Sequence, residues 1–151
     1  MKIRNASEKD VVRIPILSTR YVNEIPTWGQ VARTEDQIRQ LDRWLIWVVE
    51  DENRLVGYAI WLPHENDGSC IFENNDKILR LEEIYLVPEA RGKGIGRQLL
   101  QKINSYAKKE GYTKLFVYSS VKDLDPVIEF YRANGFKTWA VQLFKEVSED
   151  A

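Results

Sequence analysis

The chain has 151 residues, of which 44% are hydrophobic and 11% aromatic, so it suits one compact domain and excludes an intrinsically disordered protein. Its 22 Lys and Arg residues and 23 Asp and Glu residues leave a net charge of -1, which gives no overall field to attract nucleic acid or an anionic membrane. One cysteine and one histidine exclude a disulfide framework and a metal centre built from several Cys or His ligands. We expect a single domain over residues 1–151 in the cytoplasm, with neither a signal peptide nor a membrane-spanning segment.

The N-terminal third predicts one strand and two helices. Residues 2–6 favour a short strand, and residues 8–21 favour a helix that Pro15 kinks or breaks early. Thr34, followed three residues later by Gln37, is a capping-box pattern that predicts the start of a second helix, which we expect to end near residue 43.

The rest of the chain predicts strands from its apolar runs and helices from a four-residue apolar period. The expected strands cover residues 45–49, 55–62, 79–87, 114–118 and 136–147. The expected helices cover residues 94–109 and 125–134. This order predicts an α/β fold with a mixed sheet and helices on both faces.

The turn before the helix at residues 94–109 predicts a pyrophosphate site. Three glycines alternate in it, Gly92, Gly94 and Gly96, and three cations surround it, Arg91, Lys93 and Arg97. Glycines let backbone N–H groups approach a ligand, and unpaired N–H groups at a helix N-terminus attract anions. No Lys-Ser or Lys-Thr follows the glycines, and an arginine replaces the third glycine of a dinucleotide fingerprint, so both nucleotide motifs fail. A plain glycine-rich turn is the alternative.

Two motifs together carry a family resemblance. The turn Arg91-Gly92-Lys93-Gly94-Ile95-Gly96 matches R-x-x-G-x-G, and the run from Phe130 to Phe136 matches F-Y-x-x-x-G-F about forty residues later. At this spacing the chain resembles the GCN5-related N-acetyltransferases (GNAT), specifically over residues 79–136. The resemblance implies a single GNAT-like domain with a mostly antiparallel, splayed sheet.

The same resemblance implies acetyl-CoA as the co-substrate, with no metal. It places the pyrophosphate on the turn, including Ile95, and the thioester and pantetheine arm near the backbone N–H groups of Leu86 and Val87. It also places the Tyr131 hydroxyl near the CoA sulfur, where it serves as a general acid; the alternative for its neighbours Phe130, Gly135 and Phe136 is a helix C-cap with two core phenylalanines.

A base is also needed, because an alkyl ammonium group has a pKa of about 10 and must lose a proton before it attacks. Glu82 and Glu83 precede the turn, and adjacent strand residues face opposite sides, so at most one is expected to point into the cleft. The spacing from Arg91 seen in relatives favours Glu82, although a strand bulge would remove the basis for choosing by alternation. Surface charges without a catalytic role are the alternative for both.

The sequence therefore predicts an acetyl-CoA-dependent N-acetyltransferase that moves an acetyl group to a primary amine by direct attack. A catalytically silent acyl-CoA-binding or regulatory domain and an anion-binding interaction module are the alternatives. The expected partners are acetyl-CoA and a small-molecule or peptide amine, with no nucleic acid or membrane, and a homodimer is common in the family that the chain resembles. The sequence determines neither the acceptor nor the choice among Glu82, Glu83 and water as the base.

Overall fold

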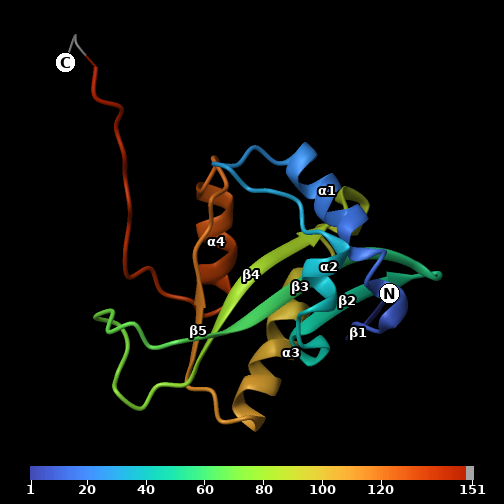
Figure 1. Cartoon of the computed structure of the whole chain (residues 1–151), viewed down its shortest axis with the longest axis horizontal. Helices are drawn as coiled ribbons and strands as arrows, with labels where there is room; N and C mark the ends of the chain where they lie inside the picture. Colours follow the sequence, from blue (N-terminus) through green and yellow to red (C-terminus); the bar gives the residue numbers. More distant parts are fainter. Residues whose placement is uncertain (149–151) are drawn as a thin grey trace.

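The computed structural model describes residues 1–148 and contains a mixed sheet in the order β1-β2-β3-β4-β5 (Figure 1). The strands are β1 Lys2–Asn5, β2 Ile46–Asp51, β3 Arg54–His64, β4 Ile78–Leu86 and β5 Lys114–Val117. Neighbours from β1 to β4 are antiparallel, and β5 joins β4 in parallel. The mostly antiparallel sheet expected from the sequence is confirmed.

The helices are α1 Ile14–Glu24, α2 Glu35–Arg39, α3 Ile95–Lys109 and α4 Asp125–Ala133, with 3-10 turns η1 Glu8–Asp10, η2 Arg43–Leu45 and η3 Pro88–Ala90. Pro15 lies in the first turn of α1, where its missing N–H is tolerated, so the expected helix begins at residue 14 rather than 8. Thr34 caps α2 with Gln37, as predicted, but α2 ends at Arg39. No helix within residues 1–148 is both long and apolar enough to cross a membrane.

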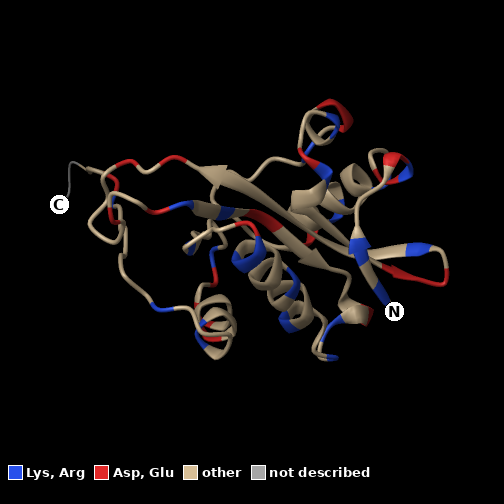
Figure 2. Cartoon of the chain, turned by 90° about the horizontal axis from the view of Figure 1, so that it is seen from below, with Lys and Arg blue, Asp and Glu red and all other residues tan. Residues whose placement is uncertain are grey.

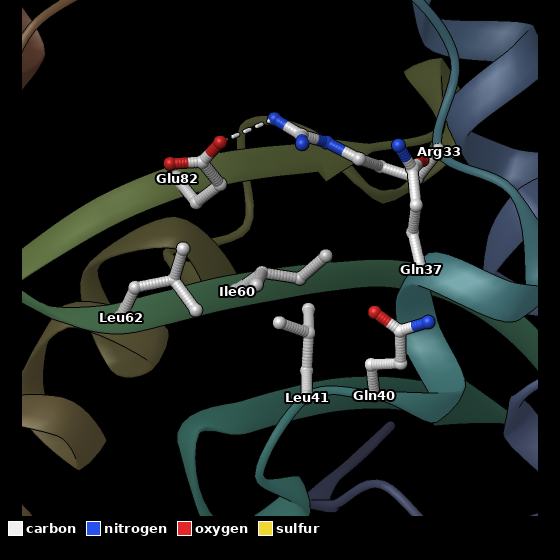
Figure 3. Close-up of a pocket in the computed structure, with 7 residues that line it drawn as sticks. All are labelled: Arg33, Gln37, Gln40, Leu41, Ile60, Leu62 and Glu82. Atoms are coloured by element: carbon white, nitrogen blue, oxygen red, sulfur yellow. Dashed lines mark hydrogen bonds and ion pairs between the residues drawn. The ribbon is translucent and has the colours of Figure 1, made fainter.

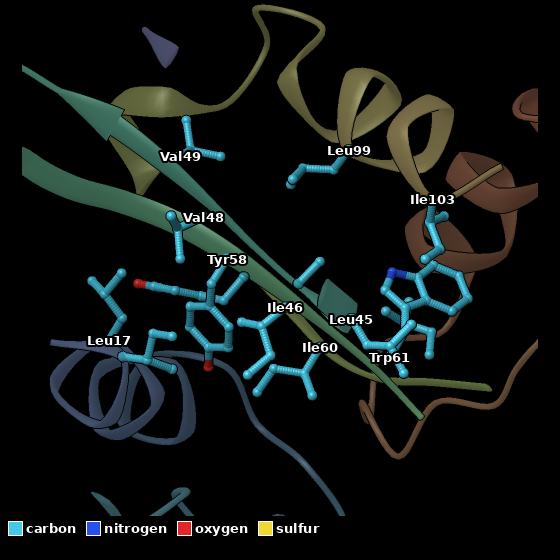
Figure 4. Packing of buried hydrophobic residues seen from close by; sticks show 14 of the residues in the cluster. Leu17, Leu45, Ile46, Val48, Val49, Tyr58, Ile60, Trp61, Leu99 and Ile103 are labelled. Atoms are coloured by element: carbon cyan, nitrogen blue, oxygen red, sulfur yellow. The ribbon is translucent and has the colours of Figure 1, made fainter. Parts of the chain in front are cut away.

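The hydrophobic core lies on both faces of the sheet. Figure 4 shows Leu17 of α1 on one face and Leu99 and Ile103 of α3 on the other. Tyr58 and Trp61 of β3 are fully buried between these layers. The predicted helices on both faces are therefore confirmed, and burial of these side chains supplies the main stabilising free energy.

The strands β4 and β5 separate along their length. They pair only from Ile78 with Lys114 to Leu81 with Val117, so within residues 1–148 the remaining half of β4 has no partner strand on that side. The sheet is therefore splayed at the carboxyl ends of these two parallel strands, the edge where α/β folds most often bind ligands.

The predicted final strand over residues 136–147 is wrong for this structure. The segment forms no strand and extends away from the body (red, Figure 1), and it leaves Leu143 91% exposed. Alternation in Trp139, Val141 and Leu143 is a strand pattern, but a strand also needs a partner edge, and among the described residues β5 pairs only with β4.

Candidate active site

A cleft of about 920 Å³ opens where β4 and β5 splay apart. The N-terminus of α3, one side of α4 and the loop between α1 and α2 complete its walls. Most residues singled out by the sequence line it: Glu82, Glu83, Leu86, Arg91, Gly92, Gly94, Ile95, Gly96, Arg97 and Tyr131. Lys93 and Val87 do not line it. The residues that do line it come from β4, the glycine turn, α3 and α4, so the fold brings four separate elements together at one site.

The glycine turn presents backbone to this cleft. Gly92 and Gly94 have φ angles of 73° and 78°, in the left-handed region, and a Cβ on either would meet nothing within 4 Å. Gly94 is also the N-cap of α3, whose first N–H groups have no partner inside the helix. Arg91 and Arg97 line the cleft at this end, and Figure 2 shows further basic residues on the helices, so the N-terminus of α3 is suited to a phosphate group.

Gly96 has a different role from the other two glycines. A Cβ there would lie 3.0 Å from the ring of Phe130, which is far tighter than normal packing. Gly96 therefore allows α3 to pack closely against α4, and so fixes the position of the helix that carries Tyr131.

Arg91 is already engaged with protein groups. Its Nε donates to the Leu86 carbonyl oxygen at 2.9 Å, and its Nη2 donates to Glu24 Oε2 at 2.5 Å. Burial opposes ionisation of Glu24, but the hydrogen bonds from Arg91 and Tyr85 prevail and hold its pKa below the usual value. Arg91 therefore ties the turn to β4 and α1.

The unpaired side of β4 offers backbone donors to the cleft. Val87 N–H donates to the Val56 carbonyl at 2.9 Å, so it is not free for a ligand, and this part of the sequence-based prediction is corrected. Hydrogen-bonding direction alternates along an antiparallel strand, so the N–H groups of Ile84 and Leu86 face the opposite side, toward the splay. Both residues line the cleft.

A β-bulge brings the two glutamates to the same side. Ile60 pairs with Glu83, while its neighbour Trp61 pairs with Leu81, which leaves Glu82 as the extra residue. Both carboxylates line the cleft, and Arg33 reaches both. The expectation that at most one would enter is wrong because the bulge breaks the alternation.

The Glu83 carboxylate is buried and fully hydrogen-bonded. Its Oε1 accepts from the hydroxyls of Ser18 (2.7 Å) and Tyr58, and its Oε2 accepts from Gln30 Nε2 (3.0 Å) and Arg33 Nε (3.0 Å). Burial, with the Glu83 charge beside it, raises the pKa of Tyr58, so this hydroxyl stays a donor at neutral pH. Glu83 therefore joins α1, β3 and the loop between α1 and α2.

Glu82 is the more accessible carboxylate. Its Oε1 accepts from Arg33 Nη2 at 2.6 Å and its Oε2 from Arg80 Nη2 at 2.7 Å, and 15% of the side chain is exposed. No group of three or more His, Cys, Asp and Glu side chains in the described part of the chain could hold a metal ion. Both oxygens of Glu82 are paired with arginines at the cleft wall.

Tyr131 of α4 lies on the cleft wall and is 9% exposed. Burial raises its pKa, and the neighbouring Tyr21 adds to the shift, so the hydroxyl remains protonated at neutral pH. Tyr21 lines the same cleft, and its own pKa is raised by burial and then by the Glu83 charge. A protonated phenol at this position is able to donate a proton into the cleft.

Two loops meet across the open end of the splay. Thr27, after α1, forms an isolated β-bridge with Val121, after β5, and Trp28 N–H donates to the Ser120 carbonyl at 2.7 Å. Sequence reasoning missed this contact, as it missed Arg33, because neither a lone bridge nor a polar loop residue has a periodic signal. Trp28 itself does not line the cleft and is 58% exposed.

With this geometry established, comparison with known proteins identifies the family. The family model of an acetyltransferase (GNAT) domain matches residues 42–138. The chain belongs to the GNAT family. This GNAT chain is 36% identical over 100 residues to an uncharacterized N-acetyltransferase of Methanocaldococcus jannaschii, a match that covers 53% of this chain and 44% of that one. The chain therefore spans half or less of the length of the curated relatives that it matches.

Solved GNAT-fold structures superpose on nearly the whole chain. An aminoglycoside N-acetyltransferase, AAC(6')-Iy, in complex with CoA has a TM-score of 0.72 at 15% identity and covers 97% of this chain and 99% of its own. A predicted acetyltransferase of Clostridium acetobutylicum with acetyl-CoA has a TM-score of 0.71 at 20% identity, with coverages of 96% and 95%. At these identities the likeness shows the fold alone.

Proposed function

We propose that this GNAT chain is an N-acetyltransferase that moves the acetyl group of acetyl-CoA directly to a primary amine. The observation that carries the proposal is the shared cleft, in which an open glycine turn, a protonated tyrosine and a strand carboxylate meet. The turn and the N-terminus of α3 would hold the pyrophosphate. The N–H groups of Ile84 and Leu86 would hold the pantetheine arm and the thioester oxygen, which gains negative charge during attack.

The proton transfers follow from the residues on the cleft wall. Glu82 takes a proton from the incoming ammonium group, directly or through a water, which frees the nitrogen lone pair. As the C–N bond forms and the C–S bond breaks, Tyr131 gives its proton to the departing sulfur. The second nitrogen proton then returns to Tyr131 through water, while Glu82 releases its proton to solvent. No covalent bond to the protein is needed.

A catalytically silent acyl-CoA-binding domain is the second candidate. The observation that favours it is that both Glu82 oxygens already accept hydrogen bonds from arginines, which leaves no free carboxylate oxygen at the cleft wall. The two functions differ in turnover, since both require acetyl-CoA to bind.

The proposal extends to the setting of the enzyme. It works in the cytoplasm, without a metal, on a small-molecule or peptide amine, and it pairs as a homodimer. The net charge of -1 supports the absence of nucleic-acid and anionic membrane partners.

The test measures thiol release from acetyl-CoA with a panel of primary amines, alongside calorimetric binding of acetyl-CoA. Turnover with at least one amine is the expected result. Tight acetyl-CoA binding without thiol release for every amine would support the silent domain, and absence of binding would leave only an anion-binding module.

A further inference from the structure

A second hollow lies beside the large cleft, behind an ion pair. Its volume is about 170 Å³, and residues from α2, from β3 and from the segment after α2 line it, together with Arg33 and Glu82 (Figure 3). Arg33 and Glu82 also line the large cleft. Their hydrogen bond of 2.6 Å therefore stands in the wall that the two spaces share.

The hollow combines an apolar floor with amide groups. Leu41, Ile60 and Leu62 form the floor, and Figure 3 shows the side chains of Gln37 and Gln40 rising from the α2 side toward the ion pair. Gln37 Oε1 accepts from Thr34 N–H in the helix cap, so its NH₂ group is left for another partner. These groups match a short aliphatic chain that ends in an uncharged hydrogen-bonding group.

The hollow contains a carboxylate, Glu82, which can pair with one ammonium group. Among the described residues, Arg33 and Glu82 are the only charged ones that line it, and each also has a charged partner outside it, Glu83 for Arg33 and Arg80 for Glu82. An ammonium group can replace Arg33 Nη2 at Glu82 Oε1, while Arg33 keeps Glu83 through its Nε at 3.0 Å. The charge of Arg33 then stays balanced by the buried Glu83, so a second charge on the acceptor would lose its water and find no uncompensated charge of opposite sign, which is unfavourable.

We propose that this hollow is the acceptor subsite and takes a short, unbranched primary amine with an uncharged amide or hydroxyl end. The inference rests on the proposed acetyl transfer and names its substrate class. A cavity needs about 10–15 Å³ to hold one water, so the hollow of about 170 Å³ admits a short chain behind the reacting nitrogen but not a bulky acceptor. The ammonium group takes the place of Arg33 on Glu82, and the polar end reaches the amides of Gln37 and Gln40.

The first experiment compares amines of matched length. 4-Aminobutanamide is compared with 4-aminobutanoate, 1,4-diaminobutane and butan-1-amine, and with the bulky polyamine sisomicin, by thiol release from acetyl-CoA. We expect a KM for 4-aminobutanamide at least about tenfold below those of the two doubly charged compounds and of sisomicin, because the hollow pairs only one charge. A KM for either doubly charged compound or for sisomicin equal to or below that of 4-aminobutanamide would overturn the inference.

The second experiment changes the hollow. Leu41→Trp fills it and should raise the KM for 4-aminobutanamide about tenfold or more while leaving the Kd of acetyl-CoA unchanged. Val31→Trp, on an exposed side chain that lines neither space, is the matched control and should change neither value. Gln40→Ala changes an exposed residue just after α2, so it serves as a second variant in case the tryptophan variant misfolds. It should raise the KM for 4-aminobutanamide but not for butan-1-amine.

The outcomes separate this inference from the function on which it rests. Turnover that is unaffected by a folded Leu41→Trp and by Gln40→Ala overturns the subsite and leaves acetyl transfer standing. Acetyl-CoA binding without thiol release for any amine overturns acetyl transfer and the subsite together.

Discussion

Glu82 and Glu83 are neighbours in the chain with different tasks. Glu83 is enclosed by four donors, whereas Glu82 faces the cleft and holds two arginines. The first arrangement is a structural joint, because every carboxylate lone pair is used inside the protein. The second leaves 15% of the side chain exposed at the cleft wall, where the proposed acceptor ammonium group would replace one arginine.

The matched pair Glu82→Gln and Glu83→Gln tests this division. Glu83→Gln should lower the free energy of unfolding by about 3 kcal/mol, because it removes the buried carboxylate charge with which Arg33 is paired. Glu82→Gln should lower kcat/KM by ~10²-fold or more and remove the acidic limb of its pH profile, because a glutamine cannot take the proton. Urea unfolding and pH–rate profiles are the measurements. The reverse pattern would make Glu83 the base.

In the proposed reaction, Tyr131 gives a proton to the departing CoA sulfur, and this proton matters only at a pH at which the free thiol is protonated. Tyr131→Phe should reduce kcat about 10²-fold at pH 7 with little change in the Kd of acetyl-CoA. Because burial raises the Tyr131 pKa, the wild-type hydroxyl stays protonated above pH 8.5. A free thiol has a pKa of about 8.5, so above that pH the CoA sulfur can depart as a thiolate without a proton from the enzyme. The deficit should therefore shrink toward pH 9.5. Tyr106→Phe on α3, outside the cleft, is the control, and a deficit that does not vary with pH would assign Tyr131 to packing.

At the scale of the elements, the turn before α3 depends on a backbone conformation. Gly94→Val places a branched side chain at φ 78°, which costs about 1–2 kcal/mol, and puts atoms where a phosphate would approach. We expect calorimetry to show lost acetyl-CoA binding. Gly111→Val has the same φ and equally open surroundings at the other end of α3, so it should cost similar stability and keep binding. Equal binding by both variants would place the pyrophosphate elsewhere.

Sequence reasoning predicted the elements that have local signals. The Thr34 cap, the apolar strands β2 and β3, and the glycine turn before α3 are encoded by neighbouring residues, and all are present. The bulge at Glu82 is not local, because it depends on the register between β3 and β4. Gly57 gave no sequence signal either: a Cβ there would lie 2.9 Å from the Tyr85 carbonyl oxygen, so glycine is needed for the approach of β3 to β4.

At the scale of the whole molecule, the sequence was least informative where distant segments meet. Residues 136–147 alternate as a strand does, yet pairing depends on an available edge, and the structure leaves Val147 fully exposed. The pairing of Arg33 with Glu82 was equally absent from sequence patterns, because Arg33 lies in a loop and reaches Glu82 across 49 positions of sequence. Periodicity reports which face of an element is buried, but it does not report which element covers that face.

A buried ion cluster ties the N-terminal elements to the sheet. The Asp10 side chain has no exposed surface and accepts from Arg4 Nη1 at 2.7 Å and from Arg13 Nη1 at 3.1 Å, which joins β1, η1 and the start of α1. Burial opposes ionisation of Asp10, but hydrogen bonds from Arg4 and Ser7 prevail and lower its pKa. The ionised carboxylate therefore stabilises the fold at neutral pH.

Asp10→Asn should cost about 3 kcal/mol at pH 7, which lowers the Tm by roughly 6–12 °C for a domain of this size. A carboxylate with a lowered folded pKa gives its full stabilisation above the unfolded value near 3.8 and loses it as the pH falls through the lower folded value. The Tm difference between wild type and Asp10→Asn should therefore be constant from pH 5 to 8 and narrow below about pH 4. Asp36→Asn, at the exposed start of α2, is the matched control. A Tm difference that persists unchanged to pH 2.5 would mean that the substitution acts through packing. The ion cluster would then not be what holds β1 and α1 to the sheet.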